Sequence, residues 1–142
     1  MNQNKSDRLI EKVIAAQRMA YAPFSNFPVG AALETKSGKI FTGCNIENSS
    51  FSLTICAERV AVFKAISEGE RDFVQIAIKA DSEEFCSPCG ACRQVIFDFA
   101  PNLKVLLLNS KNQIKEMTMR ELFPEAFTKD VLKSAVSHDK EE

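Results

Sequence analysis

The sequence predicts an α/β fold, a three-layer α/β/α sandwich built around a mixed sheet of about five strands. Three observations lead to this prediction. Apolar residues near the N-terminus recur every three to four positions, as on the buried face of a helix. Two short runs of strand length follow, joined by a turn. Segments with helical and strand patterns then alternate along the rest of the chain, which is typical of α/β proteins.

The predicted elements follow the order α, β, β, α, β, α, β, β, α. The first is an amphipathic helix over residues 6–20, whose buried face carries Leu9, Val13, Ala16 and Met19. The elements after it are the strands Val29–Thr35 and Lys39–Ile46, the helix 55–68, the strand Val74–Ala80, the helix Cys89–Phe99, the strands Leu103–Leu108 and Gln113–Thr118, and a helix Glu121–Ala135 interrupted at Pro124.

The 142 residues suit one domain, which we place at 1–136, with 137–142 as a frayed tail. A hydrophobic fraction of 45% and a charged fraction of 26% exclude disorder of the whole chain. The net charge of -1 argues against a nucleic-acid partner, because such binders normally carry a basic surplus. No apolar run approaches the ~18 residues of a membrane span, and the N-terminus lacks the apolar stretch of a signal peptide. We therefore expect a cytoplasmic protein with no membrane partner.

Five cysteines stand at positions 44, 56, 86, 89 and 92, and three of them are bunched. The odd count does not suit a disulfide framework, whereas clustered cysteines in a reducing compartment more often bind metal or perform chemistry. The one histidine, His138, lies in the C-terminal tail. A metal site in the core must therefore be built mainly from thiolates.

Two segments place cysteines at the predicted starts of helices. Thr54 is a candidate N-cap for the helix that carries Cys56, and Ser87 is a candidate N-cap for the helix that carries Cys89 and Cys92. In the first turn of a helix, the dipole and the free backbone N–H groups favour thiolate over thiol. Cys89 and Cys92 are three residues apart and share one helix face, and Cys56 would complete a three-sulfur set from the neighbouring helix.

Three protein ligands with an open fourth position are the arrangement of a catalytic zinc ion. The spacing leaves two alternatives open. Cys86 forms a CxxC pair with Cys89, so a closed structural site of four cysteines also fits, with Cys44 as a further thiol. A redox-active dithiol is the weaker alternative, because the thioredoxin-like context is missing.

Glu58 favours the catalytic arrangement. It follows Cys56 by two residues and so cannot share that residue's helix face, but it can reach a zinc-bound water from the side and take its proton. The alternative is a glutamate that only suits the helix dipole. Three thiolates would leave the centre negatively charged. Arg59 and Arg93, each directly after a ligand segment, are candidates to donate hydrogen bonds to the sulfurs.

Together these motifs resemble the zinc deaminases. Their signature pairs a metal ligand, one residue and a glutamate with a later PCxxC, here Cys56-Ala57-Glu58 and Pro88-Cys89-Gly90-Ala91-Cys92. The wider sequence, over about residues 8–132, resembles the small cytidine deaminases of the homotetrameric three-cysteine type. The stretches that carry this resemblance are Tyr21–Leu33, Gly43–Asn48, Ile55–Arg59, Ser87–Val95 and Glu121–Phe127.

The resemblance implies one Zn²⁺ per chain, held by Cys56, Cys89 and Cys92, and hydrolytic deamination of cytidine and 2′-deoxycytidine. Water activated by the zinc adds to C4 of the base, and Glu58 passes protons to N3 and to the leaving amine. Ammonia departs, and uridine or 2′-deoxyuridine remains. The resemblance also implies a role in pyrimidine salvage and a homotetramer whose active sites are completed by neighbouring subunits.

The resemblance also assigns substrate contacts. Asn45 and Glu47 match the pair that holds the ribose hydroxyls, and a spacing of two at a strand end puts both side chains on one face. Phe27 matches the aromatic residue that packs against the base, and the backbone of Ala57 matches a contact to the pyrimidine edge. Phe127 matches an aromatic residue that reaches a neighbouring subunit's site.

Arg59 matches the arginine that donates to the zinc thiolates and moderates their charge. The chain departs from the family at two positions. Phe51 matches a position near the ligand where the family commonly has tyrosine, so the ring is kept and the hydroxyl is lost. Cys86 is an extra thiol beside the site, which could oxidise or compete for metal.

Other functions share parts of this pattern. A deaminase of a related aminopyrimidine nucleoside such as blasticidin S shares the zinc motif, although the sugar-binding pair favours an ordinary nucleoside. A deaminase acting on bases within RNA or DNA is disfavoured by the net charge of -1. A non-catalytic, zinc-stabilised interaction domain would hold zinc and release no ammonia from cytidine.

Overall fold

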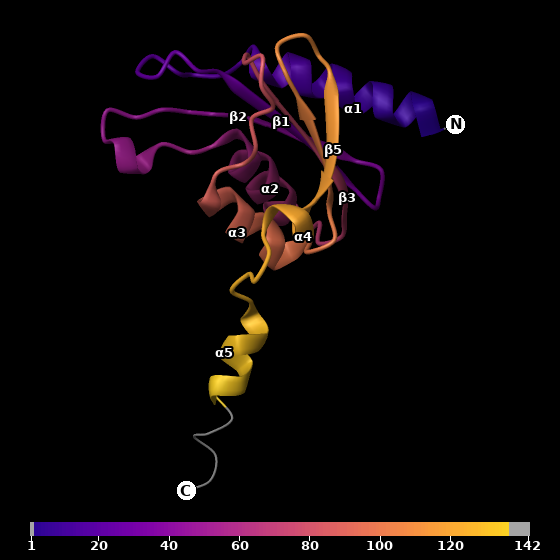
Figure 1. Ribbon diagram of the computed structural model, residues 1–142, viewed down its shortest axis with the longest axis vertical. Helices are drawn as coiled ribbons and strands as arrows, with labels where there is room; N and C mark the ends of the chain where they lie inside the picture. The colour runs from indigo at the N-terminus through magenta and orange to yellow at the C-terminus, as the bar shows by residue number, and fades with distance from the viewer. Residues whose placement is uncertain (1, 137–142) are drawn as a thin grey trace, which may run out of the picture.

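The computed structural model describes residues 2–136, so the tail predicted at 137–142 lies outside the described residues (Figure 1). The helices and strands, in chain order, are α1 (Asn2–Gln17), β1 (Val29–Thr35), β2 (Ile40–Cys44), a short 3₁₀ helix η1 (Phe51–Leu53), α2 (Ala57–Ser67), β3 (Phe73–Ala80), α3 (Gly90–Phe99), β4 (Lys104–Leu108), β5 (Ile114–Thr118), α4 (Met119–Leu122) and α5 (Lys129–Val136). None of these helices has both the length and the apolar character needed to cross a bilayer.

The described strands form a five-stranded sheet in the order β2-β1-β3-β4-β5. The pairs β1–β2, β1–β3 and β4–β5 are antiparallel, and β3–β4 is parallel with α3 as its crossover. The mixed sheet predicted from the sequence is therefore confirmed. The hairpin of β1 and β2 turns at Gly38, whose φ of 89° lies in the left-handed region that glycine adopts without steric cost.

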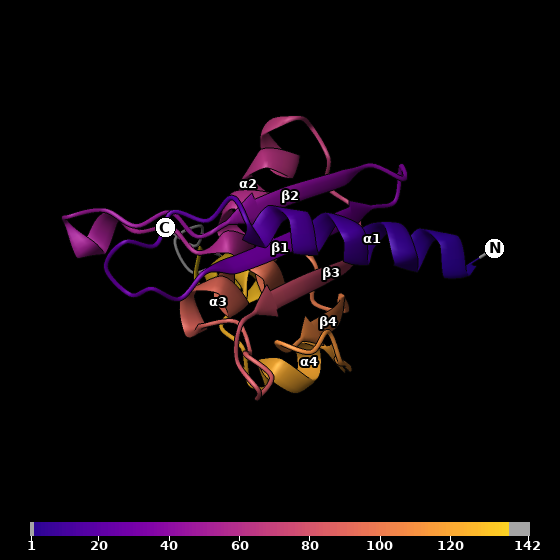
Figure 2. The ribbon, with the colours of Figure 1, turned by 90° about the horizontal axis from the view of Figure 1, so that it is seen from above.

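Helices cover both faces of the sheet, because its central strands bury side chains on both sides. Successive residues of a strand point to opposite faces. In β3, Ile76 and Ile78 pack with α2 and α3, whereas Ala77 between them packs with α1. Figure 2 shows α1 lying along β1 and β3. The three-layer α/β/α sandwich predicted from the sequence is confirmed.

Two predicted helices differ from the observed ones. The first ends at Gln17, so Met19 is 75% exposed and not on the buried face, because the chain turns there to pair Tyr21 N–H with Asn45 O. The helix predicted at Glu121–Ala135 is two helices, α4 and α5. Pro124 comes directly after Phe123, the C-cap of α4, and a proline cannot continue the backbone hydrogen-bond ladder of a helix.

The packing of α2 against β2 depends on a glycine. A Cβ atom at Gly43 would lie 2.3 Å from Ala57 O, at the first residue of α2. This distance is far below van der Waals contact, so only glycine allows the start of α2 to pack this closely on the sheet. Cys56 directly precedes α2, so Gly43 fixes how near that cysteine lies to the strand.

Candidate metal centre and adjoining pocket

Two helix N-termini meet above one face of the sheet. Ile46, just after β2, pairs with Ile55 through both backbone hydrogen bonds, each 3.0 Å long. This pairing places Cys56 beside the end of β2. The crossover from β3 to β4 brings the start of α3 to the same place, and α2 and α3 contact each other. Both helix dipoles therefore direct their positive ends toward one spot, which favours negative charge there.

Cysteines, and not the predicted Thr54 and Ser87, are the N-cap residues of the two helices. Cys56 caps α2 and Cys89 caps α3, in both cases without a side-chain capping bond. The predicted Thr54 cap is wrong because its hydroxyl accepts the Asn48 N–H at 3.2 Å instead. The two Sγ atoms therefore remain available for other partners, and Cys92 lies in the first turn of α3.

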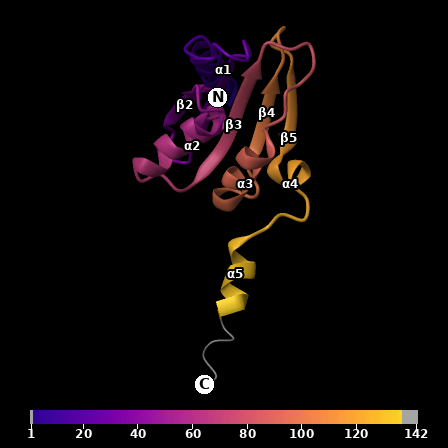
Figure 3. The same cartoon turned by 90° about the vertical axis from the view of Figure 1, so that its left-hand side faces the viewer.

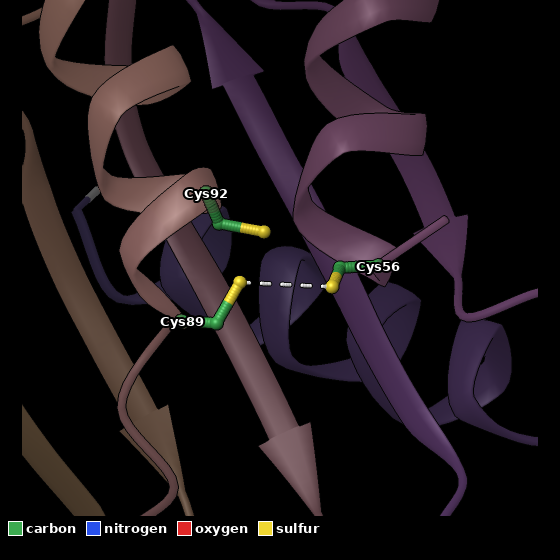
Figure 4. Close-up of side chains that lie close together, drawn as sticks. All are labelled: Cys56, Cys89 and Cys92. Atoms are coloured by element: carbon green, nitrogen blue, oxygen red, sulfur yellow. Dashed lines mark hydrogen bonds between the residues drawn. The ribbon is translucent and has the colours of Figure 1, made fainter. Parts of the chain in front are cut away.

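The sulfur atoms of Cys56, Cys89 and Cys92 point toward one another and lie within 4.8 Å of each other (Figure 4). The Sγ atoms of Cys56 and Cys89 are 3.8 Å apart. In tetrahedral zinc sites, Zn–S bonds of about 2.3 Å put neighbouring sulfurs about 3.8 Å apart. The donor set and its spacing therefore fit one zinc ion.

No fourth ligand belongs to this group among the described residues. Cys86 is near enough for the carboxylate of Glu58 to act on it electrostatically, but it stands outside the three-sulfur cluster. Cys44 is likewise outside the cluster. The geometry thus favours three protein ligands and an open position over the closed four-cysteine site that the spacing had left open.

The sulfurs already share negative charge without a metal. Hydrogen bonds from the Cys92 thiol and the Arg59 guanidinium lower the pKa of Cys56 to about 5. The pKa of Cys92 is raised, because its thiol donates to the Cys56 sulfur and is buried. One thiolate is therefore stable at neutral pH in the chain alone. A bound divalent cation would stabilise the other two cysteines as thiolates as well.

Of the two arginines predicted to donate to the sulfurs, Arg59 does so. Its Nη2 lies 3.4 Å from Cys56 Sγ, and its buried Nε has no hydrogen-bond partner among the described residues. An unpaired buried donor is costly, and negative charge on the sulfur cluster would offset part of that cost. The prediction for Arg93 is wrong, because its guanidinium donates to the carbonyl oxygens of Pro88 and Leu122.

Glu58 lies beside the sulfurs and is only 4% exposed. Burial raises the pKa of its carboxyl, and a hydrogen bond with Cys92 opposes that shift. A carboxyl whose pKa moves toward neutrality can both take and return a proton near pH 7. The position and environment of Glu58 therefore suit acid–base chemistry.

A pocket of about 270 Å³ opens onto this centre. This volume is just below the usual range for ligand sites, about 300–1,000 Å³. Its wall contains two of the sulfur ligands, the buried carboxylate and the predicted substrate-binding residues Phe27, Asn45, Glu47 and Ala57. Residues that the sequence had not singled out as substrate contacts complete the wall: Ser25, Val29, Ile78, Cys86 and Ser87.

Asn45 and Glu47 both face the pocket, and both also hold the segment before β1. Asn45 Oδ1 accepts Val29 N–H, and its Nδ2 donates to Phe27 O, each at 2.9 Å. Glu47 accepts the backbone N–H groups of Phe24 and Ser25 and the Ser25 hydroxyl. The Ser25 hydroxyl lowers the pKa of Glu47, which stays ionised. Sequence reasoning missed Ser25, although it lies in a stretch that carries the resemblance.

Phe51 and Phe127 do not line this pocket. Phe51 is 73% exposed and lines a neighbouring hollow, which shares Ser25 and Glu47 with the pocket. The ring of Phe51 packs edge-on against Phe24 there. Phe127 is 53% exposed, and its carbonyl accepts Gln94 Nε2. Within its own chain, therefore, Phe127 makes no contact with the pocket, and the role expected for it across a subunit boundary stays a prediction.

Comparison with known protein families agrees with this geometry. Residues 3–108 match the family described as the cytidine and deoxycytidylate deaminase zinc-binding region. The chain belongs to this family. The matched range contains Cys56, Cys89 and Cys92, so the zinc-binding region of the family and the three-sulfur cluster together fit one Zn²⁺ per chain.

Individual deaminases of the family resemble the chain over most of its length. The cytidine deaminase of Sporosarcina psychrophila is 52% identical over 131 residues, which cover 89% of this chain and 96% of the relative. That of Halalkalibacterium halodurans is 53% identical over 121 residues, 84% of this chain and 92% of the relative. The crystal structure of cytidine deaminase from Burkholderia pseudomallei has a TM-score of 0.83 at 46% identity, covering 85% of this chain and 98% of that one. The resemblance to cytidine deaminases stated from the sequence is confirmed.

Proposed function

We propose that the chain catalyses the zinc-dependent hydrolysis of cytidine and 2′-deoxycytidine to uridine and 2′-deoxyuridine, with release of ammonia. One observation carries the proposal. A three-sulfur zinc site and a buried glutamate open onto one small pocket, in a chain about half identical to cytidine deaminases. The reaction consumes one water, and the oxygen of that water replaces the 4-amino group of the base.

Cys56, Cys89 and Cys92 would hold the ion. Zinc, when bound, lowers the pKa of a coordinated water so that a nucleophile is available near neutral pH. The open side of the cluster faces the pocket, because Cys56 and Cys89 line it, whereas Cys92 is fully buried behind them. Arg59 offsets the charge of three thiolates, which would otherwise oppose ionisation of the water.

Glu58 is the proton carrier. Its carboxylate takes one proton from the attacking water and delivers it to N3 of the pyrimidine. It then takes the remaining proton of that oxygen, now bonded to C4, and gives it to the 4-amino nitrogen, so that the C4–N bond breaks, ammonia leaves and the C4 carbonyl forms. Burial raises the pKa of this carboxyl, which brings its two protonation states closer in free energy at neutral pH. The residue is held on the first turn of α2 and so needs no movement to reach the pocket.

The remaining wall of the pocket would orient the nucleoside. Glu47 is ionised and has acceptor capacity beyond its three hydrogen bonds, since a carboxylate offers about four lone-pair sites. It can therefore accept from a ribose hydroxyl beside Asn45. Phe27 supplies an aromatic face for the base, and the backbone of Ala57 supplies polar groups for the pyrimidine edge.

The test of this function is direct. Purified protein is incubated with cytidine or 2′-deoxycytidine, and the ultraviolet change of the base and the ammonia released are followed together. We expect one ammonia per nucleoside consumed, with both substrates active. Turnover of blasticidin S without turnover of cytidine would replace the proposed substrate. Zinc bound with no ammonia from any of them would favour a zinc-stabilised interaction domain.

Glu47→Gln should weaken the use of cytidine. The amide keeps the size of the side chain but removes the negative charge that a ribose hydroxyl would donate to, so we expect kcat/KM to fall about 10–100-fold. Steady-state kinetics on cytidine check this. Ser25→Ala is the matched control, because it removes a partner of Glu47 and keeps the carboxylate, and it should have the smaller effect. Unchanged kinetics for Glu47→Gln would contradict the assignment.

Arg59→Gln should lower turnover and leave zinc bound. The change removes the cationic donor to Cys56 Sγ, so the thiolates put more negative charge on the centre and the water ionises less readily. We expect kcat to fall about tenfold or more. Zinc content by atomic absorption and kcat on cytidine check the two halves separately. A variant that loses zinc, or that does not fold, would show a structural role instead.

We also propose that the active form is a homotetramer, in the cytoplasm, that serves pyrimidine salvage. The apolar side chains of Phe127, Val131 and Leu132 are more than half exposed, and α5 extends away from the sandwich (Figure 3). A neighbouring subunit would cover this surface and receive Phe127. The molar mass in solution, measured by light scattering at assay concentration, tests the assembly. A monomeric mass would contradict the proposed homotetramer.

A further inference from the structure

Arg93 connects the turn before α3 to the end of α4. It directly follows Cys92, and its backbone N–H donates to Cys89 O at 2.9 Å. Its Nε donates to Pro88 O at 2.7 Å, and its Nη1 donates to Leu122 O. A single side chain therefore joins the turn that presents Cys89 to a helix from a different part of the sequence.

Cys89 depends on that turn for its position. It is exposed, whereas Cys92 is fully buried, and its side chain makes no capping hydrogen bond at the start of α3. Surrounding atoms therefore confine Cys89 less than they confine Cys92. The hydrogen bond from Arg93 to Pro88 O is the side-chain contact that holds the residue next to Cys89.

The other end of the connection is well fixed. Leu122 is 5% exposed, and α4 begins with a capping box between Thr118 and Glu121. Phe123, which follows, packs edge-on against Phe97 of α3, with ring centroids 5.6 Å apart. The carbonyl of Leu122 is thus a fixed point against which the guanidinium can hold the turn.

From this geometry we infer that Arg93 is a positioning residue of the metal centre. By donating to both Pro88 O and Leu122 O, it keeps Cys89 Sγ at its 3.8 Å spacing from Cys56 Sγ and slows loss of the ion. A guanidinium can reach both carbonyls because its donors are fixed in a planar fork, whereas a lysine ammonium is a single point. Arg93 does not line the pocket, so it acts through Cys89 and not on the substrate.

The test measures release of zinc from the holoenzyme to a chromophoric chelator. Residues that orient metal ligands typically change metal affinity about 10–100-fold when they are replaced, so Arg93→Gln should release zinc about tenfold faster or more. Arg93→Lys can hold one carbonyl but not both, and should release zinc at an intermediate rate. Gln94→Ala is the matched control. It removes the neighbouring hydrogen bond from α3 to Phe127 O, leaves Pro88 untouched, and should release zinc at the wild-type rate.

Thermal melting of holo and metal-free protein separates positioning from ordinary stabilisation. If Arg93 positions the ligand, zinc should raise the melting temperature of Arg93→Gln less than that of the wild type. The inference would be overturned if Arg93→Gln lowered the melting temperature equally in the holo and the metal-free protein and released zinc at the wild-type rate. If Arg93→Gln does not fold, the same comparison with Arg93→Lys decides. The inference rests on the zinc site of the proposed function. Wild-type protein that holds zinc but converts no cytidine would refute the function alone, and the release rates would still decide the role of Arg93.

Discussion

Glu58→Gln should abolish turnover of cytidine and leave zinc in place. The amide has the size of the carboxyl but cannot carry a proton from water to N3 and to the leaving amine. General acid–base groups contribute about 10²–10⁴-fold to rate, and one residue here serves both proton transfers. We therefore expect the rate of cytidine turnover to fall about 10⁴-fold. The ultraviolet assay gives the rate, and atomic absorption gives zinc per chain. The burial of Glu58 also means that the neutral amide suits its site better than an ion does, so the fold should persist.

Glu68→Gln is the matched control for that variant. Glu68 lies at the other end of the same helix, as the C-cap of α2, and is exposed. It carries the same change of charge away from the sulfurs, so its rate should equal that of the wild type. A Glu58→Gln enzyme that kept most of its activity would show that the carboxylate is not the proton carrier, and one that lost its zinc would show that the side chain is needed to hold the metal.

Cys89→Ala should empty the metal centre, whereas Cys86→Ala should not. Both thiols line the same pocket, but the sulfur of Cys89 belongs to the three-sulfur cluster and that of Cys86 does not. Thiolate zinc sites contribute about 10–16 kcal/mol of binding free energy in zinc-finger peptides, and loss of one of three ligands removes much of such a term. We expect the Cys89 variant to be isolated without zinc, without activity, and with a lower melting temperature.

Cys86→Ala tests the same set of ligands from the opposite side. The variant should keep one zinc per chain and remain active, with at most a change in KM because its side chain borders the substrate. Zinc retained by Cys89→Ala and lost by Cys86→Ala would assign the third ligand to Cys86 and reject the cluster. Zinc lost by both variants would indicate a four-cysteine site.

Local sequence patterns predicted most of the fold, and they failed where distant contacts decide the backbone. The two faces of β3 follow from alternation alone, because the residues of a strand point to opposite sides. The residue at which α2 begins does not follow from such local patterns. Serine and threonine are good N-caps in general, but Thr54 uses its hydroxyl on Asn48, and Ile55 pairs with Ile46 outside the helix. Helix α2 can therefore begin only after Cys56.

The candidate site shows the same division. Helix geometry predicted that Cys89 and Cys92 share one face and that Arg59, three residues after Cys56, can reach its sulfur. The choice of Cys56 as the third sulfur, 33 residues from Cys89, rested on the resemblance to the zinc deaminases. The direction of Arg93 could not be predicted, since Leu122, one of its two acceptors, lies 29 residues further along the chain. Ser25 was missed for the same reason, because its bond to Glu47 spans 22 residues.

The coordination of the zinc ion is the most direct test of the account. X-ray absorption at the zinc K-edge of the purified enzyme reports the type, number and distance of the ligand atoms. Three sulfur atoms at about 2.3 Å and one lighter atom, oxygen or nitrogen, are the predicted shell. A shell of four sulfur atoms would mean that a further cysteine closes the centre, which would leave no position for the water that cytidine hydrolysis requires.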